Sequence, residues 1–358
     1  MNTLLIAFFS IIFLLILHEF GHFITAKKFG IRVEEFGIGY PPRLFGKKFG
    51  ETLYSLNLLP FGAFVRIPGV EETGGGKNNK VPAWQRAMVL LGGVVSFWII
   101  AVILLSSLFI IGAPQSISDE EGGNLINPKV QIMAVAAGSP AEVAGLRAGD
   151  AIQGFKIQNT ELKIDKVKDV QEFTEQYKGQ EVIVTVERGK EVFETSLVPR
   201  VSPPEGEGAM GIALVRTAEK SYPPLQAFIK GAQSTGNLTV AVFVGWGQVL
   251  GNLISGRGIP KGVQFMGPIG IGNLINQAAQ AGINYFLQFI AIIAIYLAVF
   301  NFLPIPALDG GKLLFLGIEK IKGSPINPKI EENITAGFFV VLVGLMIWFT
   351  IQDISRLF

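Results

Sequence analysis

Residues 2–26 read NTLLIAFFSIIFLLILHEFGHFITA, a hydrophobic segment that contains the run H-E-F-G-H at residues 18–22. Its length reaches the ~20 residues that an α-helix needs to cross the ~30 Å hydrocarbon core of a bilayer. On a helix, residues i and i+4 lie about 40° apart around the axis and roughly 6 Å apart along it. Two imidazoles at this spacing can bind one zinc ion from a single helix face.

His18 and His22 are the only histidines in the chain, and Glu19 beside them is suited to act as a general base. The alternative reading is a polar cluster at a helix end, satisfied by backbone or water. Placing three ionisable groups at membrane depth is costly, and such residues are functional by default. We therefore expect His18 and His22 to be metal ligands and Glu19 to be catalytic.

The composition is that of a membrane protein. Hydrophobic residues make up 49% of the chain, charged residues 16%, and the mean hydropathy is +0.46. The absence of cysteine excludes disulfides, thiolate metal ligands and a cysteine nucleophile. The net charge of +2 does not indicate a partner, and we expect neither nucleic acid nor nucleotide to bind.

Four segments predict transmembrane helices, namely residues 2–26, 87–113, 281–307 and 334–351. Lysine and arginine gather between the first two segments and again between the last two. By the positive-inside rule these two loops are cytoplasmic, so the N-terminus and the long stretch 114–280 are predicted to be extracytoplasmic.

A fifth hydrophobic stretch, residues 237–254, is apolar enough to be mistaken for a span. Its three interior glycines and its flanking cations also suit a helix that lies at the membrane interface. Parity favours the interfacial reading if a metal ligand comes from the far end of the chain. His22 and that ligand must then be separated by an even number of crossings.

Two histidines leave zinc short of a third protein ligand. The candidate is Asp309, in the run NFLPIPALDGG at residues 301–311. Pro304 and Pro306 remove backbone donors and are expected to break the third span at its cytoplasmic end. The broken backbone can turn a carboxylate toward the first span. An ordinary loop aspartate is the alternative, but the histidine motif on the same membrane face favours a ligand.

H-E-F-G-H in the first span and N-x-x-P-x-P-x-L-D-G near the third resemble the site-2 protease family of intramembrane zinc metalloproteases. Within that family, the chain resembles the bacterial regulator of sigma-E protease group. Residues 36–44 (FGIGYPPRL) and 267–271 (GPIGI) are similar to further elements of the family. Residues 54–65 (YSLNLLPFGAFV) resemble its membrane-dipping β-hairpin, which implies a hairpin over 33–67. The resemblance also implies that residues 237–254 do not span.

Two departures from the family pattern stand out. Ser96 occupies the place of an asparagine thought to help hold the substrate or the site, in the run LGGVVSF at residues 91–97. Lys312 stands where a histidine frequently follows L-D-G-G. None of the expected ligands is altered, and neither is the base.

Residues 128–201 predict a compact α/β module, because S-P-A-x-x-A-G-L-x-x-G-D at 139–150 is followed by paired strands. This order resembles a bacterial PDZ domain, a module that adds an extended peptide to a sheet edge. A plain structural spacer is the alternative. The expected architecture is thus a polytopic α-helical membrane protein with four transmembrane helices, a membrane-dipping β-hairpin and one extracytoplasmic PDZ-like domain. Its parts are residues 1–113 (first half of the protease core), 128–201, 222–280 (membrane-associated) and 281–358 (second half of the core).

Weaker candidates surround the metal site. Asn301 is a possible outer-sphere or oxyanion donor, and Ser96 a possible substrate contact. Residues 52–67 carry β-branched and aromatic side chains and could pair with an unwound substrate as an added strand, with Gly62 and Phe64 as contacts. An ordinary cytoplasmic hairpin is the alternative.

The expected function is hydrolysis, with Zn²⁺ as cofactor, of a peptide bond in or near the transmembrane segment of single-span membrane proteins. A truncated anti-sigma factor, cut beforehand by another protease, would be one such substrate. The location would be the cell (inner) membrane, with the active site toward the cytoplasm. A catalytically silent PDZ scaffold and a transporter are the alternatives. The absence of a visible inverted repeat argues against a transporter.

Overall fold

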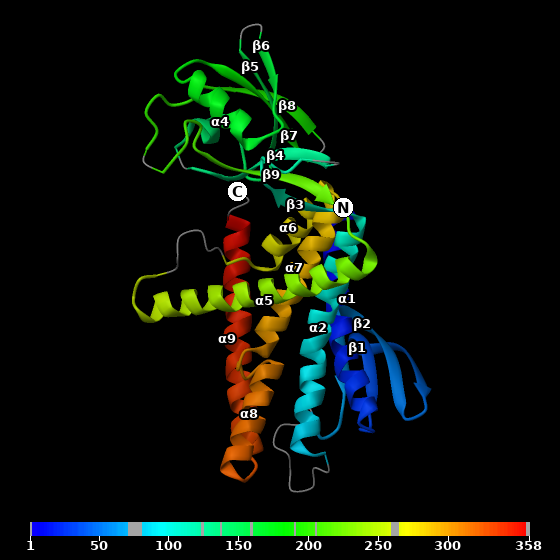
Figure 1. Ribbon diagram of the computed structural model, residues 1–358. Coiled ribbons are helices and arrows are strands. Elements are labelled where there is room, and N and C mark those ends of the chain that lie inside the picture. Colours follow the sequence, from blue (N-terminus) through cyan, green and yellow to red (C-terminus); the bar gives the residue numbers. More distant parts are fainter. Residues whose placement is uncertain are drawn as a thin grey trace. The chain divides into compact units, whose positions relative to one another are not determined.

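The computed structural model describes residues 2–70, 81–122, 125–136, 138–157, 160–189, 191–204, 206–258 and 265–355. Two cations of the first expected cytoplasmic loop, Lys77 and Lys80, lie outside these ranges. The chain divides into two compact units (Figure 1). The first comprises residues 1–106, 228–279 and 285–358, and the second comprises 107–227 and 280–284.

The helices are α1 (Asn2–Lys28), α2 (Ala83–Ile111), α3 (Pro140–Val143), α4 (Val167–Gln176), α5 (Pro224–Ile254), α6 (Pro268–Ala281), α7 (Ile283–Phe302), α8 (Asp309–Lys322) and α9 (Pro328–Ser355). The strands are β1 (Glu35–Phe49), β2 (Thr52–Arg66), β3 (Ala113–Ile117), β4 (Ile126–Val135), β5 (Ala151–Ile157), β6 (Thr160–Lys163), β7 (Val182–Arg188), β8 (Glu191–Leu197) and β9 (Ile212–Lys220).

Within the described ranges, five helices are long and apolar enough to cross a membrane: α1, α2, α5, α7 and α9. Four of them coincide with the predicted spans, which confirms a polytopic membrane protein. The fifth, α5, contains the ambiguous stretch 237–254 and begins well before it, at Pro224. It is the least apolar of the five, and in Figure 1 it crosses α7 and α9 instead of running along them. Four crossings therefore remain a prediction.

The helices of the first unit pack through a core that is built around small residues of α7. Ala294 and Ala298 are fully buried there, next to Phe97 of α2 and Leu14 of α1. Small side chains allow helices to approach closely where lipid removes the usual hydrophobic driving force. This packing brings α1 and α2 together at the level of the histidine motif.

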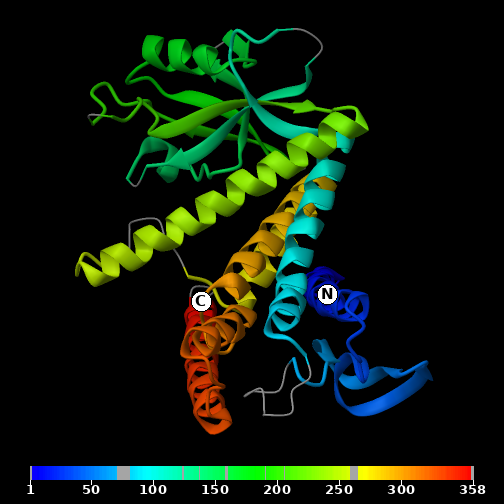
Figure 2. The same ribbon diagram turned by 60° about the horizontal axis from the view of Figure 1, so that its bottom comes forward.

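The expected hairpin is present as β1 and β2, within one residue or two of the predicted bounds 33–67. The start of β1, at Glu35–Ile38, pairs with both halves of β2, so the hairpin is curled. β2 lies against α1, as the edge-to-face contact between Phe8 and Phe61 shows, and Figure 2 shows the rest of the hairpin projecting from the helices. Several of its large apolar side chains are exposed, among them Leu44, Phe45 and Phe61.

The second unit is an antiparallel sheet in the order β3-β9-β4-β5-β7-β8, with β6 beside β5. Its core is apolar, and Phe155 of β5 stacks on Phe173 of α4 with the ring centroids 4.6 Å apart. The S-P-A-x-x-A-G-L-x-x-G-D run forms tight local structure, since the Ser139 hydroxyl accepts the Glu142 N–H and caps α3. The sheet extends beyond the expected bounds 128–201, because β3 and β9 lie outside them and pair over Ala113–Ile117.

Candidate metal centre

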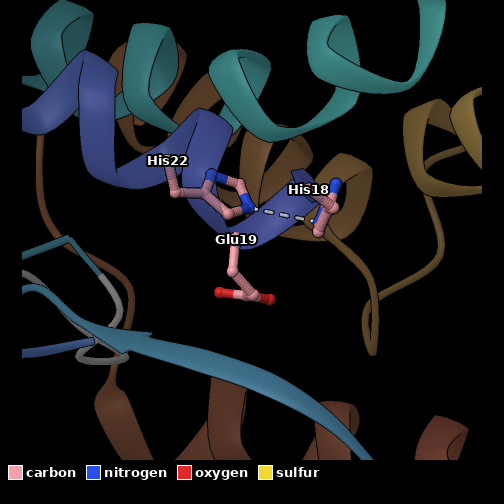
Figure 3. Close-up of side chains that lie close together, drawn as sticks. All are labelled: His18, Glu19 and His22. Atoms are coloured by element: carbon pink, nitrogen blue, oxygen red, sulfur yellow. Dashed lines mark hydrogen bonds between the residues drawn. The ribbon is translucent and has the colours of Figure 1, made fainter. Parts of the chain in front are cut away.

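α1 presents His18 and His22 on one face, as the i, i+4 spacing requires. Their Nε2 atoms lie 3.2 Å apart, and Figure 3 shows both imidazoles on the same side of the helix with Glu19 projecting away from them. The ligand atoms of all three residues lie within 4.8 Å of one another. His18 and His22 are buried, so one helix turn supplies two nitrogen donors in a site largely closed to solvent.

Asp309 joins the two histidines from the other end of the chain. α7 ends at Phe302, the prolines at 304 and 306 interrupt the helix, and Asp309 opens α8. Its Oδ2 lies 3.1 Å from His18 Nε2 and 3.3 Å from His22 Nε2. The turn that makes this approach requires glycine after the aspartate, because a Cβ on Gly310 would lie 2.6 Å from the Phe302 carbonyl carbon.

These three atoms form a nearly equilateral triangle with sides of 3.1 to 3.3 Å. For a tetrahedral zinc ion with bonds of ~2.0–2.1 Å, neighbouring ligand atoms are about 3.3 Å apart. Asp309 Oδ2 is also buried without a hydrogen-bond partner, although two nitrogen atoms face it. The donor set, the spacing and the orphaned oxygen all fit a zinc ion held by His18, His22 and Asp309.

A backbone carbonyl orients one of the ligands. The Nδ1–H of His22 donates to the Val89 carbonyl at 2.8 Å, which leaves the Nε2 lone pair directed at the metal position. His18 stacks on Phe97 with a centroid distance of 4.6 Å and an interplanar angle of 17°. Both neighbours lie on α2, so this helix holds the two imidazoles in place.

A seam of glycines lets α2 come this close. A Cβ on Gly93 would lie 2.8 Å from His18 Cε1 and closer still to the ring of His22. Gly21 and Gly92 face each other in the same seam, and a Cβ on either would collide with the other's backbone. These positions were not identified from the sequence, although the pair at 92–93 in an uncharged span was a visible signal. Val89 acts through its carbonyl, so its side chain carried no signal.

Glu19 lines a cavity of about 60 Å³ together with His22, Asp309 and Lys312. The remaining wall is apolar and comes from residues 67, 70, 89 and 90. A cavity of ~10–15 Å³ by this measure holds one water molecule. The space beside Glu19 can therefore hold water next to the metal position.

Ser96 and Asn301, the weaker site candidates on α2 and α7, lie outside the lining of this cavity. The Ser96 hydroxyl donates to the Gly93 carbonyl at 2.6 Å, and the Asn301 amide donates to the Leu297 carbonyl of its own helix at 2.9 Å. Neither is among the residues that line the cavity.

Gly62 and Phe64 lie on β2. Gly62 has φ +125° and faces Leu15 of α1, whereas the Phe64 ring packs over Gly37 and stacks on Tyr40. Burial, aided by the charge of Glu19, raises the pKa of the Tyr40 hydroxyl. This part of the hairpin is thus within electrostatic reach of the metal centre.

Residues 6–345 match the profile of peptidase family M50. The chain belongs to this family. M50 membership confirms the expected site-2 protease resemblance and the expectation of a metallopeptidase. The chain is 30% identical to the regulator of sigma-W protease RasP of Bacillus subtilis, over 98% of both proteins. It is also 30% identical to the zinc metalloprotease RasP of Shouchella clausii over the full length of both, and that name agrees with the expected Zn²⁺.

Proposed function

We propose that this M50 chain is an intramembrane zinc endopeptidase that cuts single-span membrane proteins in or near their transmembrane segments. A truncated anti-sigma factor, released for cutting by an earlier protease, is the substrate type that we favour. The supporting observation is the triangle of His18, His22 and Asp309 atoms, two of which belong to α1, a helix with the length and apolarity of a span. A peptidase site on a membrane-spanning helix would cleave peptide bonds of segments that lie in or near the bilayer.

When bound, zinc would polarise the scissile carbonyl and lower the pKa of a water molecule in the cavity. Glu19 is placed to accept a proton as this water attacks the carbonyl carbon, and then to deliver that proton to the amide nitrogen. The C–N bond breaks, giving a new carboxylate and a new amine. Residues 67, 70, 89 and 90 give the cavity an apolar wall beside the reacting groups.

A transmembrane helix hides its own amides, so cleavage requires local unwinding. We propose that the hairpin β1–β2 dips into the membrane and receives the unwound segment as an added strand. Its exposed apolar side chains and its contact with α1 beside the histidine motif support this role. Gly62 and Phe64 are the residues that we place closest to the substrate.

We propose four crossings in the cell (inner) membrane, with α5 in the interfacial plane and the active site toward the cytoplasm. With this parity, the N-terminus and the second unit are extracytoplasmic. We interpret the second unit as a PDZ-like domain that excludes membrane proteins with bulky outer domains, so that a prior cut is needed. The crossing of α5 over α7 and α9 supports the interfacial placement.

The test uses co-expression with tagged single-span proteins, comparing the wild type with Glu19→Gln and Asp309→Ala. Glu19→Gln is expected to keep zinc and lose cleavage, because Glu19 is not a ligand. Asp309→Ala is expected to lose both, with zinc affinity reduced by more than the ~10- to 100-fold typical of outer-sphere changes. Full cleavage by either variant would contradict the proposal.

A further inference from the structure

We infer that Lys312 is a further residue of the active site, and that its ammonium group stabilises negative charge on the carbonyl oxygen during peptide hydrolysis. This inference rests on the proposed function. It concerns a side chain outside the ligand set and is independent of the role expected of Asn301, which stays a prediction.

The position of Lys312 follows from the helix that begins at the third ligand. Residues three apart on an α-helix lie on the same face, so Lys312 lies one turn beyond Asp309 on the same side of α8. The structure agrees, because Lys312 lines the cavity that Glu19, His22 and Asp309 also line. Among the described residues of that lining, Lys312 is the one cation.

The same face of α8 continues into a second, smaller cavity, which shares Val70, Leu90 and Lys312 with the first. Its other charged lining residues are Arg86, Glu319 and Glu331. Arg86 is directed to Glu319, with Nη1 3.7 Å from Oε2, and both side chains are nearly buried. Arg86 is therefore engaged away from the metal centre, whereas Lys312 stands between the two cavities.

The linings of the two cavities together carry more negative than positive charge. Two cations face four carboxylates there, which formally leaves two negative charges for a zinc ion to balance. Lys312 is half-buried where the two cavities meet, so its ammonium group is partly removed from water and lies close to the negative charges of both linings. Beside the metal position, the ammonium group would attract the negative charge that develops on the carbonyl oxygen as water adds. This attraction becomes stronger as the charge forms, so it stabilises the transition state more than the bound substrate and raises kcat.

The test compares Lys312→Met and Lys312→Arg with Lys320→Met, a matched lysine that is exposed on the same helix. The purified, zinc-loaded full-length enzyme is assayed on a single-span substrate, and zinc content is measured alongside. Lys312→Met is expected to keep zinc and to lower kcat about 100-fold with KM within about twofold. Lys312→Arg is expected to recover most of this loss, and Lys320→Met to behave as the wild type.

A phosphinic peptide, which carries the tetrahedral oxyanion permanently, separates this role from a structural one. Its inhibition constant in Lys312→Met is expected to rise by about the same factor as kcat/KM falls. An unchanged inhibition constant, or unchanged kcat, overturns the inference while leaving the proposed function intact. Loss of zinc from Lys312→Met also overturns it, because the residue would then hold the metal centre together. Absence of cleavage by the wild type would instead refute the proposed function.

Discussion

Substitution of Gly93 by alanine tests whether the close approach of α1 and α2 is what shapes the metal centre. The added Cβ would lie 2.8 Å from His18 Cε1, and nearer to the His22 ring. Ordinary contacts between carbon atoms are about 3.5–4.0 Å long. The imidazole of His18 must then retreat by about 0.7 Å or more, and that of His22 by more.

A displacement of this size is large compared with what a metal tolerates. Zinc–ligand distances in a competent site stay within ~0.2 Å of their usual values. His22 cannot simply rotate away, since its Nδ1–H is held by the Val89 carbonyl at 2.8 Å. We expect Gly93→Ala to weaken zinc binding at least as much as a change in an outer-sphere partner, by about 10- to 100-fold or more.

The assay is zinc stoichiometry of the detergent-purified protein, followed by competition with a chelator of known affinity. Gly344→Ala on α9 is the matched control, because a Cβ at Gly344 meets nothing within 4 Å. Alanine in a helix interior is favoured over glycine by ~1 kcal/mol, so the control should be neutral or stabilising. A Gly93→Ala protein with wild-type zinc affinity would refute the reasoning.

Two further predictions concern buried carboxylates. Arg188→Ala removes the two charged hydrogen bonds of 2.7 Å that hold the buried Asp150 carboxylate. The substitution should destabilise the second unit by about 2 to 3 kcal/mol, less than for a fully buried pair because the Arg188 side chain is 34% exposed. Limited proteolysis of residues 107–227 in intact membranes should then be faster than in the wild type. Resistance to the protease equal to that of the wild type would contradict this prediction. Asp353→Ala removes the carboxylate that accepts the N–H groups of Gly267 and Gly270 at 2.8 and 2.7 Å before and within α6. A loss of about 1 to 2 kcal/mol is expected, measured as a lower midpoint of thermal unfolding in detergent, with Asp353→Asn losing less because it keeps an acceptor.

The sequence was most informative where function constrains residue type locally. The histidine spacing and the L-D-G-G run each indicate one half of the metal centre, and the prolines before Asp309 explain the break that positions it. The hairpin could be predicted because the family resemblance supported what the β-branched and aromatic residues of 52–67 suggested. Length and apolarity alone do not distinguish α5 from a membrane-spanning helix. Where a helix lies depends on its packing against segments that are distant in the sequence.

The positions that could not be predicted act through three-dimensional proximity. Gly93 is required because two rings from another helix occupy the space of its missing side chain. Val89 contributes a carbonyl, a group that every residue carries. The pairing of β3 with β9 joins segments far apart in the chain, on either side of the stretch that local patterns identified.

That pairing determines the order in which the second unit can assemble. β9 lies between β3 and β4 but is the last of the sheet's strands to be synthesised. Until it emerges from the ribosome, β3 and β4 expose unpaired edges, so closure of the sheet waits for the most distant contacts in the unit. Closure also draws the start of α5 to the end of α2, where the Tyr222 N–H donates to the Phe109 carbonyl at 2.9 Å. A deletion of residues 128–201 would leave β3 and β9 as a two-stranded remnant. Excision of residues 113–220 removes the whole sheet and leaves α2 joined to α5 by a short linker that ends in Pro223.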